Sequence, residues 1–263
     1  MEFERAKLDI DGPVGIVTLN HPEVMNAVSL EMLGGLMQVL EHVEDPKNGV
    51  RCLLMTGAGR GFCAGANLQP RAEGSGGSRD AGLVLETQYH PFLRRLRELP
   101  MPFVTAVNGA AAGVGMSFAL MGDLVVCARS AYFMQAFRRI GMVPDGGSTW
   151  ILPRLVGKAR AMELSLLGER LPAEKALEWG LVNRVFDDAD LIEKAKALAL
   201  DLANGPTLAL SLIRRLYWES ADNTYEEQLN LERQLQRKAG NSADSREGVR
   251  AFLEKRPAKF KGE

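Results

Sequence analysis

The sequence has few of the residues that build metal centres or disulfide frameworks. Its 263 residues include three histidines, His21, His42 and His90, without the spacing of metal ligands, which argues against a structural metal or a zinc hydrolase site. The three cysteines form no CxxC pair, and their odd number is typical of reduced thiols in the cytosol. We therefore expect a cytoplasmic protein that binds no metal.

A strong charge of either sign and a long apolar run are also missing. The 32 basic and 33 acidic side chains leave a formal net charge of −1, so no overall field favours a nucleic acid or an anionic membrane as partner. No apolar run approaches the roughly 18 residues of a membrane span. The charged N-terminal segment also lacks a signal-peptide core. These absences leave a small molecule as the expected partner.

Strand and helix patterns alternate in the first half of the chain. Short β-branched runs bounded by Gly, Pro or Asn predict buried strands at residues 14–20, 50–57, 103–109 and 123–128. Between them, apolar residues at helical spacing predict one helix that Ser29 caps and Pro46 ends, and another over residues 84–99. Such alternation is typical of an α/β fold with parallel βαβ units.

The second half of the chain is mainly helical in pattern. From about residue 153 helical spacing prevails, with one predicted strand at residues 180–186. Thr224 and Glu227 predict a capping box at the start of a late helix. The Gly/Ser-rich stretch at residues 70–82 is either a lid over a site or a tolerated surface loop.

Two familiar sequence motifs are nearly matched, but each lacks a required part. Residues 59–64 fit the GxGxxA form of a dinucleotide fingerprint, yet Gly65 and Pro70 prevent the long helix that should follow. The run GMSFA, residues 115–119, resembles a nucleophile elbow, but no histidine follows Ser117. Neither a Rossmann site nor a serine hydrolase is therefore expected.

Two glycine-rich turns remain as candidates for chemistry. The runs CAGANL (63–68) and NGAAAGVGMSFAL (108–120) each follow a predicted buried strand, and the second run opens an apolar helix. Free backbone N–H groups at such a helix start favour negative charge, and two converging donors form an oxyanion hole. The alternative is that these small residues only allow close packing of helix against sheet. Spacing alone does not choose between the two.

A single acidic residue, Asp145, lies between Pro144 and the pair Gly146–Gly147. This run has the composition of a turn, in which the aspartate caps its own backbone. If the carboxylate instead faces a substrate, apolar neighbours should raise its pKa and suit it to proton transfer. The expected walls are Phe133, Phe137, Ile140 and Trp150.

Several longer motifs occur in the order and spacing of the crotonase, or enoyl-CoA hydratase/isomerase, superfamily. They include GFCAGANL, PFVTAVNGAAAGVG, DLVVCARSAYF, IGMVPDGG, LPRLVGKARAMEL and ALEWGLV, so the chain resembles this family over nearly its whole length. The resemblance implies an α/β spiral of ββα units at residues 1–200 and a C-terminal helical trimerisation region at residues 201–263. It also implies homotrimers, or hexamers that are dimers of trimers, with coenzyme A bound as part of an acyl-CoA substrate and no separate cofactor.

The resemblance also suggests roles for individual residues. The backbone N–H groups of Ala66 and Val114 correspond to the oxyanion donors. The residues that correspond to the substrate and CoA pocket are Met25, Asn26, Ala27, Ala64, Asn67, Leu68, His90, Ser117, Phe137, Phe252 and Lys255. Phe252 and Lys255 match tail residues that in this family often come from a neighbouring subunit. The basic residues near them, Arg250 to Lys261, either attract phosphates or form a solvated helix end.

Within this family the acidic residues determine the reaction. Hydratases use two glutamates, whose positions align with Ser117 and Phe137 here, so only Asp145 remains. An aspartate at this place is similar to dienoyl-CoA-type isomerases and above all to the phenylacetate-pathway isomerases that convert ring-epoxide phenylacetyl-CoA into its oxepin. The resemblance thus implies an acyl-CoA isomerase in which Asp145 moves a proton or assists ring opening while the oxyanion hole carries the enolate.

Other functions remain open at this point. In 4-chlorobenzoyl-CoA dehalogenases the same aspartate attacks the ring with help from a histidine that aligns with His90. However, a pocket tryptophan is replaced by Phe137, and Tyr89 replaces another aromatic residue. A weak enoyl-CoA hydratase and a non-enzymatic CoA-ester-binding assembly protein, in which Asp145 is only a turn cap, are the remaining alternatives.

Overall fold

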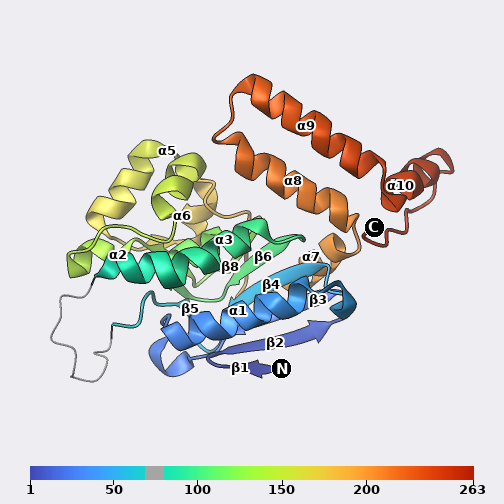
Figure 1. Ribbon diagram of the computed structural model, residues 1–263. Coiled ribbons are helices and arrows are strands. Elements are labelled where there is room, and N and C mark those ends of the chain that lie inside the picture. Colours follow the sequence, from blue (N-terminus) through green and yellow to red (C-terminus); the bar gives the residue numbers. More distant parts are fainter. Residues whose placement is uncertain (69–79) are drawn as a thin grey trace.

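Two β-sheets organise the computed structural model, which describes residues 1–68 and 80–263 (Figure 1). The seven-stranded sheet has the order β1-β2-β3-β4-β6-β8-β11 and is parallel from β3 onward, and the four-stranded sheet has the order β10-β9-β7-β5. The strands are β1 (Glu2–Phe3), β2 (Ala6–Asp11), β3 (Val14–Leu19), β4 (Cys52–Gly57), β5 (Gly61–Cys63), β6 (Phe103–Val107), β7 (Ala110–Ala112), β8 (Leu124–Ala128), β9 (Tyr132–Met134), β10 (Leu171–Pro172) and β11 (Arg184–Phe186).

The chain visits the two sheets in turn. Each unit places one strand in the large sheet and the next in the small sheet, and a helix follows: β4 and β5 lead to α2 and α3, β6 and β7 to α4, and β8 and β9 to α5. The helices up to residue 203 are α1 (Leu30–Glu44), α2 (Ala81–Val84), α3 (His90–Glu98), α4 (Val114–Leu120), α5 (Ser148–Leu167), α6 (Ala173–Glu178) and α7 (Leu191–Ala203). The predicted α/β spiral of ββα units is confirmed.

The helix ends show which local signals were read correctly. The Ser29 hydroxyl accepts a hydrogen bond from the Met32 N–H at 3.3 Å, as expected for the N-cap of α1. The helix predicted over 84–99 begins earlier, at Ala81, because the Asp80 carboxylate accepts a bond from the Leu83 N–H. A π-helical turn, η3 (Leu85–Tyr89), joins α2 to α3.

Two other predicted segments differ from the structure or lie outside it. The strand predicted at 180–186 is confined to Arg184–Phe186, because the N–H groups of Gly180 and Leu181 donate to the Leu177 and Ala176 carbonyls and so close the end of α6. Residues 69–79, most of the predicted lid or loop at 70–82, lie outside the described residues. The three remaining short helical turns are η1 (Pro22–Val24), η2 (Pro46–Asn48) and η4 (Ala136–Ile140).

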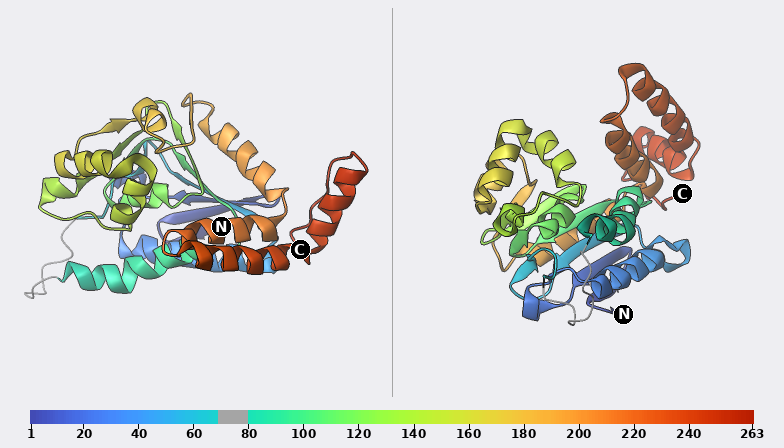
Figure 2. Two further views of the ribbon diagram at one scale, coloured as in Figure 1. Left: turned by 90° about the horizontal axis from the view of Figure 1, so that it is seen from above. Right: turned by 60° about the vertical axis from the view of Figure 1, so that its left-hand side comes forward.

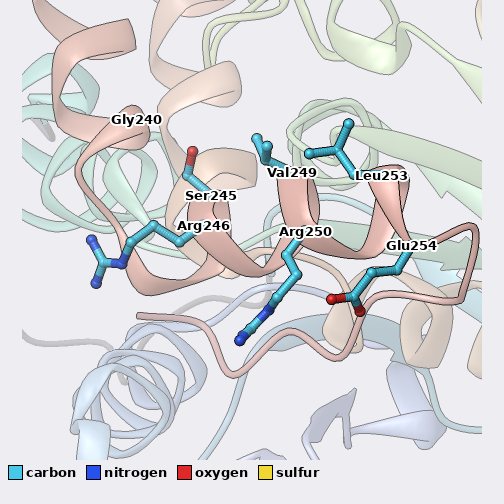
Figure 3. A pocket seen from close by; sticks show the side chains of 7 residues that line it. All are labelled: Gly240, Ser245, Arg246, Val249, Arg250, Leu253 and Glu254. Atoms are coloured by element: carbon cyan, nitrogen blue, oxygen red, sulfur yellow. The ribbon is translucent and has the colours of Figure 1, made fainter.

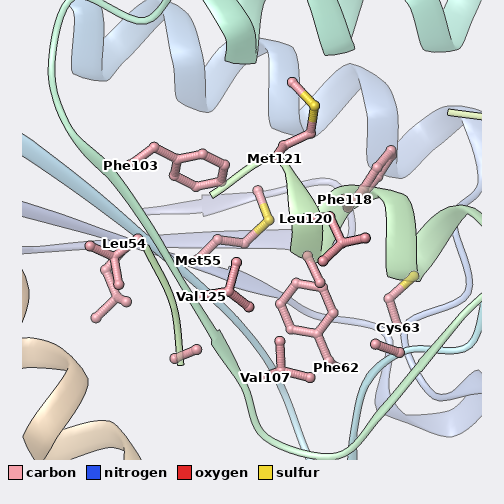
Figure 4. Close-up of a cluster of buried hydrophobic side chains, with 14 of the residues drawn as sticks. Leu54, Met55, Phe62, Cys63, Phe103, Val107, Phe118, Leu120, Met121 and Val125 are labelled. Carbon is pink, nitrogen blue, oxygen red and sulfur yellow. The ribbon is translucent and has the colours of Figure 1, made fainter. Parts of the chain in front are cut away.

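The hydrophobic core lies between the sheets and the helices that cover them. Figure 4 shows Phe62 beside Leu120 and Val107 in this core, and all three side chains are buried. The Phe118 ring lies 5.1 Å from the Phe92 ring and 6.5 Å from the Tyr89 ring, measured between centroids. These aromatic contacts fix α3 against α4, the two helices that flank the candidate site.

The last three helices, α8 (Thr207–Ser220), α9 (Tyr225–Gly240) and α10 (Ala243–Leu253), extend away from the sheets as a C-terminal arm (Figures 1 and 2). The predicted capping box of Thr224 and Glu227 is present at the start of α9. Only a small cluster, Leu212, Leu231 and Leu235, is buried between α8 and α9. The division at residue 200 and trimerisation by this region stay predictions. No helix in the described part of the chain has both the length and the apolarity to cross a membrane.

Candidate active site

The two glycine-rich turns meet at the edge of the small sheet. A Cβ atom on Gly113 would lie 3.8 Å from the Gly65 Cα, and one on Gly65 would lie 3.1 Å from the Ala112 carbonyl oxygen. Both glycines have positive φ angles, +52° and +107°, which other residues adopt at a cost. The glycines therefore bring the backbones after β5 and β7 into contact.

The start of α4 packs directly on the end of β5. A Cβ atom on Gly115 would overlap the Cys63 carbonyl oxygen, so the small residues do serve close packing. This packing leaves the N–H groups of Ala66 and Val114 without an acceptor among the described residues. Ala66 is exposed, while Val114 is buried at the first position of α4. Close packing and free donors thus occur together, and free donors are what an oxyanion hole requires.

The turn that carries Asp145 is fastened to α4 and α5. The Asp145 carbonyl oxygen accepts bonds from the Ser117 hydroxyl at 3.0 Å, the Ser148 hydroxyl at 2.9 Å and the Ser148 N–H at 3.2 Å. Gly146 has a φ of +63°, and a Cβ atom there would come within 2.7 Å of the Ser117 Cβ. These contacts fix the backbone of the turn beside the first helical turn of α4.

The Asp145 carboxylate makes none of these hydrogen bonds. Its Oδ1 atom is buried and has no hydrogen-bond partner among the described residues. Burial raises the pKa of Asp145 from 3.8 to about 6, as the sequence predicted for a carboxylate with apolar walls. The turn-cap interpretation is wrong, because the backbone carbonyl and two serines hold the turn while the carboxylate stays unpaired.

A cavity of about 250 Å³ begins next to this turn and is bounded by His90, Gly146, Gly147 and Trp150, among others. His90, at the start of α3, therefore shares a cavity with the residues that follow Asp145. Of the predicted walls, Phe133 and Phe137 are buried and Trp150 lines this cavity. Ile140 is 53% exposed on η4, so its prediction as a wall is wrong.

The two segments predicted to border CoA run side by side. The Ala64 N–H donates to the Met25 carbonyl at 2.9 Å, and the Asn67 N–H donates to the Val28 carbonyl at 2.8 Å. These bonds place Met25 and Ala27 beside Ala64 and Asn67, and Leu68 beyond them is 64% exposed. These two bonds fix the segment that carries the Ala66 donor against residues 25–28.

Three of the predicted pocket residues have structural roles in this chain. Asn26 is fully buried, and its amide nitrogen donates to the Ala58 and Gly61 carbonyls, so its side chain builds the turn. The fully buried Ser117 holds the Asp145 turn. Phe137 packs its ring against Gly113, where a Cβ atom would lie 3.9 Å from the ring. Ser148 performs the same task as Ser117, and no pattern in the sequence indicated it.

Phe252 and Lys255 are not brought to the site within one chain. They lie at the end of α10, on the opposite side of the molecule from the turn before α5 (Figures 1 and 2). Phe252 is 83% exposed. Figure 3 shows Val249 and Leu253 projecting from one side of α10 and Arg250 from the other. Arg250 pairs with Glu247 at 3.0 Å, so part of the predicted basic cluster is neutralised within the arm.

Comparisons with known proteins agree on one family. The family model described as enoyl-CoA hydratase/isomerase matches residues 9–263. The chain is 49% identical over 254 residues to a 1,2-epoxyphenylacetyl-CoA isomerase of Escherichia coli (strain K12), covering 96% of this chain and 97% of the relative. It is 41% identical over 262 residues to a probable enoyl-CoA hydratase of Rhodobacter capsulatus, covering 100% of both. The crystal structure of an enoyl-CoA hydratase from Bacillus anthracis superimposes with a TM-score of 0.91 at 31% identity, covering 98% of this chain and 100% of that one.

Proposed function

Because this chain belongs to the enoyl-CoA hydratase/isomerase family and is an enzyme of that family, we propose that it isomerises acyl-CoA thioesters with Asp145 as its single acid–base group. The observation that carries the proposal is the half-buried Asp145 carboxylate beside α4, whose buried Oδ1 atom has no partner among the described residues. The two positions at which hydratases of the family have glutamates hold Ser117 and Phe137, which cannot activate water. One carboxylate suits proton transfer within a single substrate better than hydration.

The thioester is held at the junction of the two glycine-rich turns. The segments at 25–28 and 64–68 border the CoA moiety, and the thioester oxygen accepts hydrogen bonds from the Ala66 and Val114 N–H groups. The position of Val114 supports this assignment, because it is the first residue of α4, and partial positive charge accumulates at the start of a helix. Two fixed donors stabilise an enolate oxygen more than a neutral carbonyl, so they accelerate the step that forms the enolate.

Double-bond migration then needs one proton carrier. In a 3-enoyl thioester, the Asp145 carboxylate takes a proton from the α carbon, and the electron pair moves into the thioester to give a dienolate. The protonated Asp145 returns this proton to the γ carbon, and the double bond now lies between the α and β carbons. A pKa of about 6 keeps the group ionised at neutral pH yet makes it a competent acid after the first step.

The finer proposal is that the physiological substrate is a ring-epoxide phenylacetyl-CoA. It is supported by the similarity to the E. coli relative, which is named a 1,2-epoxyphenylacetyl-CoA isomerase. The rearrangement conserves every atom of the substrate, so one carboxyl group beside the ring and an oxyanion hole at the thioester meet its needs. No water, metal or redox partner enters the balance of this reaction.

A kinetic and mass-spectrometric experiment tests this proposal. Isomerisation leaves the mass of the thioester unchanged, whereas hydration adds water and dehalogenation replaces halogen by oxygen. Asp145→Asn should lower kcat by about 10²- to 10⁴-fold with little change in affinity for CoA esters. Asp187→Asn, which changes an exposed carboxylate in an ion pair with Arg129, is the matched control. Turnover of a 3-enoyl-CoA by Asp145→Asn at the wild-type rate would overturn the mechanism.

One observation favours a second candidate, a dehalogenase of 4-chlorobenzoyl-CoA type. His90 shares the cavity with Gly146 and Gly147, so a histidine lies near the aspartate as that reaction requires. Phe137 and Tyr89 still replace the aromatic residues of the dehalogenase pocket. If wild-type protein releases chloride from 4-chlorobenzoyl-CoA and His90→Gln does not, the dehalogenase becomes the favoured function. If the protein is an isomerase, His90→Gln should still isomerise its substrate.

We also infer that the active enzyme is a homotrimer or a hexamer. Phe252 and Lys255, which resemble CoA-contacting residues of the family, lie far from Asp145 in their own chain. A neighbouring chain is therefore the source from which such residues would reach the site.

A further inference from the structure

The cavity beside the Asp145 turn has walls from four helices. Gly146 and Gly147 form the side next to Asp145, His90 comes from α3, and Met121 follows α4. Trp150 and Ile151 of α5, Trp218 of α8, and Leu93, Arg94 and Arg97 of α3 also line it. A volume of about 250 Å³ is small for a ligand pocket, since pockets for drug-sized ligands begin near 300 Å³. The cavity thus suits the acyl end of a thioester and not the CoA moiety.

The two tryptophans at this wall are held rigidly. Their rings stack with centroids 5.4 Å apart and planes at 16°. The Arg154 guanidinium lies 3.9 Å from the Trp150 ring centroid, and the Arg97 guanidinium lies 5.4 Å from that of Trp218. A cation over each ring of a stacked pair resists rotation of either side chain. The wall is therefore a fixed surface, unlike a flexible aliphatic one.

Trp218 is positioned by the ion pair of the buried Arg214, one turn earlier on α8. The Arg214 side chain, 5% exposed, donates to the Asp123 carboxylate at 2.5 Å and to the carbonyls of Leu99 and Leu96 at 2.5 and 3.1 Å. Residues four apart lie on the same helix face, so this anchor orients Trp218 toward the core. The C-terminal arm thereby contributes a wall to the cavity of its own chain.

We propose that Trp218, backed by Trp150, limits the size of the acyl group, admitting a short chain or a single ring and excluding a long straight chain. This inference rests on the proposed function, because it takes Asp145 as the group that faces the α and γ carbons. Acyl atoms beyond the γ carbon then enter the cavity at Gly146 and Gly147 and reach the Trp150–Trp218 wall. Because the Trp218 indole is held rigidly, its position limits the length of the acyl group that can bind without displacing the Trp150–Trp218 stack.

The test compares two isomerisable substrates, 3-hexenoyl-CoA and 3-dodecenoyl-CoA, in wild-type enzyme and four variants. Trp218→Ala and Trp150→Ala should each raise the ratio of kcat/KM for the long substrate over the short one by about tenfold or more, since one methylene in an apolar pocket changes discrimination by about 10- to 200-fold. Trp218→Phe should give a smaller rise. Trp179→Ala should leave the ratio unchanged, because Trp179 is also flanked by cations, Arg160 and Lys175, but does not line this cavity.

Failure of this inference differs from failure of the proposed function. A ratio within twofold of the wild-type value in folded Trp218→Ala, or an equal rise in Trp179→Ala, would overturn the role of Trp218 while isomerisation itself remains. If the wild-type enzyme isomerises neither substrate, the Kd values of hexanoyl-CoA and dodecanoyl-CoA, measured by calorimetry on the same variants, give the same comparison without turnover. An unchanged Kd ratio in Trp218→Ala would then overturn the inference, and a tenfold change would support it.

Discussion

The ββα core and the C-terminal arm are built on different principles. In the core, side chains such as Phe62, Phe103 and Phe118 are fully buried, and glycines allow backbone segments to touch. In the arm, α8 and α9 share only a small buried cluster, while Tyr217 and Phe252 are 78% and 83% exposed. The core can hold an unpaired carboxylate because its packing fixes the backbone around it. The arm depends on a few specific contacts with the core and leaves large apolar side chains exposed.

The largest expected effect comes from cutting the main link between the two regions. Arg214→Leu removes the ion-pair partner of Asp123, whose side chain is 22% exposed and keeps its bond from the Phe103 N–H at 2.7 Å. Removing one member of a fully buried pair costs about 3–5 kcal/mol, so with Asp123 partly exposed the free energy of unfolding should fall by about 2–4 kcal/mol in urea denaturation. Arg215→Leu, on the same helix but exposed and paired only with Glu219, is the control and should cost less than about 0.5 kcal/mol.

The double variant Arg214→Leu with Asp123→Leu sharpens this prediction. Replacing both members of a buried pair by apolar residues is often close to neutral. Most of the stability lost in the single variant should therefore return. A single variant as stable as the wild type would show that other contacts hold the arm, such as the hydrogen bonds of Arg51 to Thr207 and Gly205.

The next effect concerns the pH dependence of catalysis in the core. The base form of Asp145 is required to take the first proton, and burial raises its pKa to about 6. The value of kcat/KM should therefore be constant near neutral pH and fall about tenfold per pH unit below 6, because kcat/KM reports the free enzyme. Steady-state kinetics with 3-hexenoyl-CoA from pH 4.5 to 8 measure this limb. A limb near pH 4 would mean that water or a partner pairs the carboxylate.

A smaller effect is expected on the stability of the core. The pKa of Asp145 is about 6 when folded and near 3.8 when unfolded, so the folded state holds its proton more tightly. Its contribution to stability falls as pH rises through this window, and the cost is complete above pH 6. Asp145→Asn should therefore be more stable than the wild type by about 1–3 kcal/mol at pH 7 and by little at pH 4. Thermal or urea unfolding at both pH values measures the difference, and a less stable variant at pH 7 would restore the turn-cap role.

The smallest change in chain stability is expected in the arm. Phe252→Ser alters a side chain that is 83% exposed, so the free energy of unfolding of a single chain should change by less than about 0.5 kcal/mol. If a neighbouring chain uses Phe252 against CoA, the same variant should bind CoA esters more weakly. Light scattering should give a mass that is a multiple of three chains. A clean monomer at micromolar concentration would contradict the trimer.

Most of the core was predictable from local patterns. The strands at β3, β4, β6 and β8, the Ser29 cap and the Thr224–Glu227 capping box follow from β-branched runs and short-range hydrogen bonding. Errors arose at element boundaries. The N–H groups of Gly180 and Leu181 close the end of α6 and shorten the strand predicted after it, and the Asp80 cap begins a helix earlier than its apolar face suggested.

The candidate site was predictable in part. The PDGG turn and the two glycine-rich runs were visible in the sequence, as was a raised pKa for Asp145. The role of Ser148 beside Ser117 was not, because both serines act on a carbonyl that belongs to another segment. Ile140 was expected in the wall and is exposed, because the short helix η4 turns it outward.

The sequence by itself determined the fold class, the family and the single acid available for chemistry, because these depend on local periodicity and on residues at fixed spacing. The tertiary structure decided which distant residues meet. It joined Ser117 and Ser148 on one carbonyl and left the Asp145 carboxylate unpaired. It also stacked Trp218 on Trp150, 68 residues earlier in the chain, through the anchor of Arg214 on Asp123. Such contacts depend on how helices pack against sheets. That packing is governed by side-chain volumes and buried charges of residues far apart in the sequence, so a local sequence pattern does not reveal it.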